Sequence, residues 1–140
     1  MPRDAKLDML QSVPLFAGLA RSDLQRVAQL ADTVDLPADK VLMRQGNSGA
    51  EMFVVESGSA RVDRDGVEIA RVGPGQFFGE MALVAEGPRT ATVTTLEPSR
   101  MFVVGHREFH ALMDDVPSVR DAVLACVADR IRRLEAGSGH

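Results

Sequence analysis

The stretch from residue 75 to residue 95 reads GQFFGEMALVAEGPRTATVTT and places one glycine and one glutamate within an apolar run. Backbone N–H groups in the first turn of a helix have no partner within the helix, so they bind anions readily. Gly79 lets a ligand lie close to the backbone because glycine has no side chain. The stretch therefore predicts an anion site at a short helical turn, anchored on a β core by Phe77, Phe78, Met81, Leu83 and Val84.

Two charged residues extend this site. Glu80 offers two acceptor oxygens, which suit the hydroxyl groups of a sugar. Arg89 follows the stiff residue Pro88 and is the only basic residue between Arg71 and Arg100. A guanidinium opposite a helix N-terminus suits bidentate capture of a phosphate. The two residues predict a pocket for a molecule with one phosphate and free hydroxyls, and the simpler interpretation is an ion pair between them on a surface loop.

Short segments rich in Val, Ile, Phe and Thr lie on both sides of this stretch, separated by Gly, Pro, Asn and Asp. Such segments are typical of strands in a sandwich, barrel or jelly roll. Asp65-Gly66, between two alternating segments, predicts a tight hairpin. The predicted strands are Val41 to Arg44, Glu51 to Glu56, Ser59 to Asp63, Val67 to Val72, Ala91 to Thr95 and Arg100 to Val104.

The N-terminal part shows helical periodicity. Ser22 and Gln25 have the spacing of a capping box, which predicts a helix from about Ser22 to Asp32. A shorter helix is expected from Lys6 to Gln11.

The C-terminal part is helical as well. A short helix is expected from Arg107 to Met113, and Pro117 suits the first position of a longer one. The apolar stripe of the longer helix consists of Val119, Val123, Cys126, Val127, Ile131 and Leu134.

A chain of 140 residues has the length of one domain. We expect an α+β, mainly β fold: a β-roll or jelly roll of about eight short antiparallel strands over residues 36–104. Helices within residues 4–32 and 106–135 flank the roll, and residues 1–136 form a single domain. Residues 137–140 resemble a linker or tag remnant.

Composition narrows the function. Sixteen basic and twenty acidic residues give a net charge of −4, which argues against nucleic-acid binding by this chain alone. The single cysteine, Cys126, cannot pair within the chain, so a reducing compartment fits best. Neither a signal peptide nor a run long enough to cross a membrane is recognisable. We therefore expect a cytoplasmic location without membrane contact.

Two strings carry a resemblance to a known family. Phe78-Gly79-Glu80-Met81-Ala82-Leu83 and Pro88-Arg89-Thr90-Ala91-Thr92-Val93 resemble the phosphate-binding cassette of cyclic nucleotide-binding domains. Such domains occur in protein kinase A and G regulatory regions, cyclic nucleotide-gated channels and the catabolite activator protein. The similarity covers nearly the whole chain, and it implies a short phosphate-binding helix inside the roll.

The resemblance also implies roles for individual residues. Glu80 would bind the ribose 2′-hydroxyl, and Arg89 would bind the exocyclic oxygens of the cyclic phosphate. Backbone N–H groups would line the same pocket, from Gly79, Met81, Ala82, Thr90 and Ala91. The ligand would be cyclic AMP or cyclic GMP, without a cofactor.

Two further residues have alternative interpretations. Thr90 is implied to accept the guanine amino group, or else it is a β-branched residue that enters a strand. Arg130 shares a face with the apolar stripe and is expected to cap the purine. Alternatively, Arg130 complements the C-terminal end of the helix dipole.

The expected function is a regulatory sensor that is not an enzyme: it binds a cyclic nucleotide and signals by closing its C-terminal helices over the base. The alternative is an effector domain of a Crp/Fnr-type transcription regulator, or of a larger channel, kinase or enzyme. An effector domain or partner protein is possible, and both monomer and dimer stay open. A metal enzyme based on His106 and His110, at i and i+4, is a weaker alternative because a third ligand is hard to find.

Overall fold

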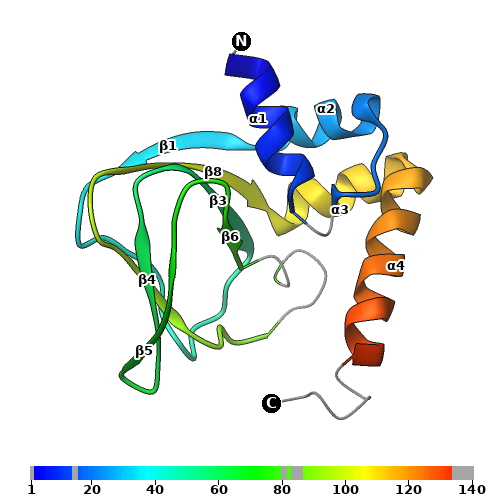
Figure 1. Cartoon of the computed structure of the whole chain (residues 1–140). Helices are drawn as coiled ribbons and strands as arrows, with labels where there is room; N and C mark the ends of the chain where they lie inside the picture. The colour runs from blue at the N-terminus through cyan, green and yellow to red at the C-terminus, as the bar shows by residue number, and fades with distance from the viewer. Residues whose placement is uncertain (1, 14–15, 80–81, 83–86, 134–140) are drawn as a thin grey trace.

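The computed structural model of the chain describes residues 2–13, 16–79, 82 and 87–133 (Figure 1). Within these residues four helices flank eight strands. The helices are α1 (Pro2–Gln11), α2 (Arg21–Leu30), α3 (His106–Asp115) and α4 (Pro117–Arg133). The strands are β1 (Asp32–Leu36), β2 (Val41–Met43), β3 (Glu51–Ser57), β4 (Ala60–Arg64), β5 (Val67–Val72), β6 (Phe77–Phe78), β7 (Thr92–Thr95) and β8 (Ser99–Gly105).

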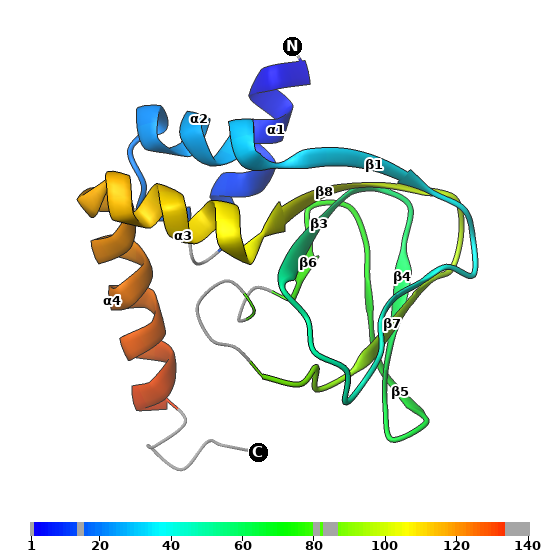
Figure 2. The same ribbon diagram turned by 180° about the vertical axis from the view of Figure 1, so that it is seen from behind.

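The strands form two antiparallel sheets that face each other as a roll. One sheet has the order β1-β8-β3-β6, and the other has the order β2-β7-β4-β5. Figures 1 and 2 show the four helices gathered at one end of the roll. The predicted mainly β roll of about eight antiparallel strands is therefore confirmed.

The hairpin between β4 and β5 follows directly from its turn residues. Asp65 and Gly66 have φ angles of +53° and +80°, the left-handed values that a two-residue hairpin turn with the twist of its strands requires. Arg64 pairs with Val67 across this turn. The predicted tight hairpin is confirmed.

The strand β3 carries two cores because both of its faces are covered. Met52 and Val54 pack among the helices, whereas Phe53 and Val55 point into the roll. Neighbouring residues of a strand point to opposite faces, so four consecutive buried residues require cover on both sides. Inside the roll the ring of Phe53 stacks on Phe78, with 5.0 Å between ring centroids.

The core outside the roll lies between the helices and the outer face of strands β3 and β8. Phe16 and Phe109 meet at a centroid distance of 5.6 Å. Val119 and Val123 of α4 are buried in this cluster, as the predicted stripe requires. The side chains of Cys126, Val127 and Ile131 lie outside the described set, and so does Leu134.

Three expectations from local sequence need correction. The helix α2 begins at Arg21 and has no side-chain cap, so the predicted capping box at Ser22 is wrong: Leu24 N already bonds to Ala20 O. The helix also ends at Leu30, and the roll begins at Asp32 because residues 32–36 pair with β8 as strand β1. Phe77 and Phe78 form strand β6 against β3, a strand that is absent from those predicted from the sequence.

Of the residues expected to form the phosphate-binding helix, which begins at Gly79, the structure describes only Gly79 and Ala82. No helix of the described part of the chain is long and apolar enough to cross a membrane.

Candidate functional site

The backbone of Arg89 is fixed by the turn that follows β2. Arg89 N donates to Asn47 O at 2.8 Å, and Gly46 N donates to Arg89 O at 2.8 Å. Ser48 and Pro88 form an isolated antiparallel bridge beside these bonds. The segment that enters β7 is thus held by backbone bonds, which fix where the Arg89 side chain starts.

The Arg89 side chain is half-buried and turned toward the start of β3. Its Nη2 donates to Glu51 O at 2.8 Å, and within the described residues this is the guanidinium's only hydrogen bond. Burial lowers the pKa of Arg89, and the nearby Glu51 carboxylate partly offsets this effect. Within the described residues no carboxylate forms an ion pair with Arg89, and the donors of this half-buried cation other than Nη2 have no partner there. Such a group is suited to bind an anion.

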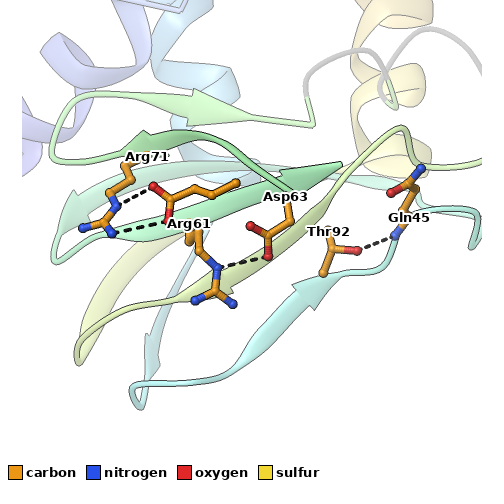
Figure 3. Close-up of polar contacts among 6 residues, drawn as sticks. Gln45, Arg61, Asp63, Arg71 and Thr92 are labelled. Atoms are coloured by element: carbon orange, nitrogen blue, oxygen red, sulfur yellow. Dashed lines mark hydrogen bonds and ion pairs between the residues drawn. The ribbon is translucent and has the colours of Figure 1, made fainter. Parts of the chain in front are cut away.

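Arg61 and Arg71 of the roll are paired with carboxylates, in contrast to Arg89. Figure 3 shows Arg71 bonded to Glu68, with Nε to Oε2 at 2.9 Å, and Arg61 bonded to Asp63, with Nε to Oδ2 at 3.0 Å. These pairs lie on the sheet that contains β4 and β5, and they are partly or largely exposed. Pairs of this kind contribute little to stability and leave no strong anion site.

Two glycines leave room for the Arg89 guanidinium. Gly79 has a φ of +80°, and a Cβ there would lie 2.8 Å from Glu51 O and 2.9 Å from Arg89 Nη1. A Cβ at Gly49 would overlap Arg89 Nε and Cζ. Gly79 is thus where glycine is needed both for its backbone conformation and for close approach. The packing of Gly49 against Arg89 has no signature in the sequence.

Open hollows lie around this arginine. One, of about 250 Å³, is lined by Arg89, Glu51, residues 41–44 and residues 47–49. A neighbouring one, of about 460 Å³, is lined by residues 48–51, Gly87 and His106. The two share Ser48, Gly49 and Glu51, so the Arg89 side chain and the start of α3 border one continuous region of the surface.

The remaining predicted residues are placed as follows. Ala82 lies beside Gly79, because its N–H donates to Gly79 O at 3.0 Å. Thr90 is exposed, and its carbonyl accepts a bond from Arg64 Nε at 3.2 Å. Ala91 is buried at the entry to β7. Glu80 and Met81 lie outside the described residues, as does the side chain of Arg130 in α4.

The histidine pair considered from sequence, His106 and His110, does form a contact. The rings of His106 and His110 are 4.2 Å apart between centroids. Within the described residues no group of three or more His, Cys, Asp or Glu side chains could hold a metal ion.

Comparison with known proteins gives consistent matches. The family model of the cyclic nucleotide-binding domain matches residues 33–116. The crystal structure of the N-terminal domain of a transcriptional regulator from Streptomyces coelicolor A3(2) is similar, with a TM-score of 0.84 and 32% identity over 93% of this chain and 94% of that chain. The regulatory domain of Toxoplasma gondii PKA, co-crystallised with cAMP, has a TM-score of 0.73 and 31% identity over 79% and 44% of the two chains.

Among curated proteins, the cyclic AMP receptor protein of Thermus thermophilus is 30% identical over 131 residues, which are 90% of this chain and 61% of that protein. A cAMP-dependent protein kinase regulatory subunit from Emericella nidulans is 30% identical over 79% of this chain and 27% of the subunit. The chain therefore spans less than two thirds of these curated relatives.

Proposed function

We propose, given that the chain belongs to the cyclic nucleotide-binding domain family, that it is a regulatory sensor module which binds a 3′,5′-cyclic nucleotide. The observation that carries this proposal is the half-buried Arg89 guanidinium, which borders Gly79 and has a single hydrogen bond to the part of the chain that the structure describes. A cyclic phosphate carries one negative charge and exocyclic oxygens that match the guanidinium fork. We assign the chain no catalytic step.

In this proposal Arg89 binds the exocyclic phosphate oxygens. Gly79 presents its N–H group to the same phosphate, and Ala82, whose own N–H donates to Gly79 O, lines the pocket beside it. Thr90 and Ala91 add N–H groups from the entry to β7, and Met81 adds one from the cassette. Glu80 binds the ribose 2′-hydroxyl, the role that a carboxylate acceptor suits best.

Cyclic AMP is the ligand that we place first. Two of the similar proteins carry this nucleotide in their names or titles, the Thermus receptor protein and the Toxoplasma regulatory domain. Cyclic GMP is second, because Thr90, which directly follows Arg89 and is exposed, has a hydroxyl that can accept a hydrogen bond from the guanine amino group.

The output of the module is proposed to run through its C-terminal helices. The helix α4 packs on α3 through Val119 and Val123, in the same core as Phe109. Ligand binding would shift the population toward a state in which α4 covers the base, with Arg130 as the cap. The match to the N-terminal domain of a transcriptional regulator favours one alternative, an effector domain that acts on an attached output domain.

Isothermal titration tests this proposal. The chain is titrated with cyclic AMP and, in parallel, with cyclic GMP, and 5′-AMP serves as the control because it has the base and ribose but a dianionic open phosphate. We expect Kd values in the micromolar range or tighter for cyclic AMP and no comparable binding of 5′-AMP. Absence of heat and of any thermal shift with either cyclic nucleotide at millimolar concentration would refute the sensor function.

A further inference from the structure

His106 lies where strand β8 ends and helix α3 begins. Gly105 is the N-cap of α3, in an extended conformation, and it provides no side-chain cap. His106 N instead donates to Ala50 O at 2.6 Å. The first residue of α3 is therefore fixed to the segment that leads into β3, one residue before the carbonyl that holds Arg89.

The imidazole of His106 reaches in a second direction. Its Nδ1 lies 2.6 Å from Ala82 O, a half-buried contact between residues 24 positions apart. A carbonyl oxygen only accepts hydrogen bonds, so this contact requires a proton on His106 Nδ1. Ala82 is in turn bonded to Gly79 through its own N–H. A continuous path of two hydrogen bonds thus leads from Gly79, beside the Arg89 guanidinium, to the first residue of α3.

The next turn of α3 supports the His106 ring. The ring of His110 lies 4.2 Å from that of His106 between centroids, and within the described residues its buried Nε2 has no hydrogen-bond partner. This contact packs the His106 ring against its own helix. A movement of Ala82 would therefore act on α3 as a body rather than on a freely rotating side chain.

We propose that His106 is the positioning residue that couples the backbone at Gly79 and Ala82 to the C-terminal helices α3 and α4. It does so by donating a hydrogen bond from Nδ1 to Ala82 O. The inference rests on the proposed function, because Gly79 and Ala82 are assigned there to the phosphate site. Ligand contact at these residues fixes Ala82 O, and Ala82 O fixes the start of α3. The helix α4 follows because it packs on α3 in a common core. Linkage requires the reverse effect as well: loss of the contact weakens ligand binding.

Three variants separate this role from a general structural one. His106→Asn keeps an N–H donor near the position of Nδ1, whereas His106→Leu removes it. Arg107→Leu is the matched control, since Arg107 is the next residue of α3 and is exposed. For each variant we would measure the Kd for cyclic AMP by titration and the ligand-induced change in amide hydrogen exchange of residues 117–133.

We expect His106→Leu to weaken cyclic AMP binding by about fivefold to tenfold and to abolish the ligand-induced change in α4 exchange. His106→Asn should retain most of both properties, and Arg107→Leu should match the unmodified chain. Equal loss in the Leu and Asn variants, or an unchanged Leu variant, would overturn the inference while cyclic AMP binding by the unmodified chain still upheld the sensor function. No binding by the unmodified chain would refute both.

A measurement on the unmodified chain covers the case in which His106→Leu does not fold. Nitrogen-15 NMR of the imidazole reports which ring nitrogen carries the proton. A protonated Nδ1 in the cyclic AMP complex is expected, and an unprotonated Nδ1 there would overturn the inference.

Discussion

Replacement of Arg89 by leucine removes the cation that the proposed site depends on. Loss of one partner of a buried hydrogen-bonded charge pair costs about 2–5 kcal/mol. At about 1.4 kcal/mol per tenfold, the Kd for a cyclic nucleotide should rise by about 30-fold to 4,000-fold. The upper part of this range is expected because Arg89 is half-buried and no carboxylate of the described residues forms an ion pair with it.

The same replacement should hardly affect folding. Arg89→Leu loses the hydrogen bond to Glu51 O, worth about 0.5–1.5 kcal/mol net. It also removes the cost of burying a charge, the effect that lowers the pKa of Arg89 in the folded chain. The two terms oppose each other, so we expect the free energy of unfolding to change by no more than about 1 kcal/mol.

Titration calorimetry together with urea unfolding measures both quantities. Arg71→Leu is the control, because Arg71 is exposed and paired with Glu68 away from the site (Figure 3). Arg89→Lys should bind with intermediate affinity, since an ammonium keeps the charge but lacks the planar fork. An Arg89→Leu variant that binds within threefold of the unmodified chain would refute the reasoning. So would a variant that loses binding only because it no longer folds.

Three further outcomes are expected. Gly49→Val places a side chain on the Arg89 guanidinium, so cyclic AMP binding should weaken at least tenfold in titration while the melting temperature stays nearly unchanged, because Gly49 does not have a positive φ. Thr95→Val removes a fully buried hydroxyl that donates to one backbone group at 2.7 Å and accepts from another at 2.8 Å; urea unfolding should show a loss of about 1–3 kcal/mol, and an unchanged midpoint would contradict this. Gly66→Ala places a side chain on a residue with a φ of +80°, so the free energy of unfolding should fall by about 1–2 kcal/mol in the same assay. Asp65→Gly should leave it nearly unchanged.

Local chemistry explains which parts of the fold the sequence predicts. Asp65-Gly66 specifies its hairpin because the required φ angles belong to those two residues. By contrast, β1 is a strand only because it pairs with β8, whose residues lie more than sixty positions away. Its sequence, DTVDL, has few apolar residues, so the alternation of apolar and polar residues does not predict a strand there. Strand β6 has two residues, too few for any period, and it owes its position to the stacking of Phe78 on Phe53.

The same distinction applies to the candidate site. Arg89 and Gly79 are recognisable from sequence because a guanidinium and a missing side chain are chemical properties of the residues themselves. The groups that hold Arg89 are not recognisable in this way. Glu51 contributes its backbone carbonyl, which every residue possesses, and Gly49 contributes empty space that matters only once Arg89 lies over it. The contact of His106 with Ala82 depends likewise on how α3 meets the loop.

The start of β3 connects the proposed phosphate site with the C-terminal helices. Ala50 O accepts a hydrogen bond from His106 N, and the next carbonyl, that of Glu51, accepts one from Arg89. Glu51 also pairs with Gly105, the N-cap of α3. Ala50 and Glu51 are themselves exposed, but residues 52–55, which follow them directly in β3, are buried between the two cores and anchor this segment. We therefore infer that a shift of α3 is driven from the side of Ala82, through the contact between the imidazole of His106 and Ala82 O.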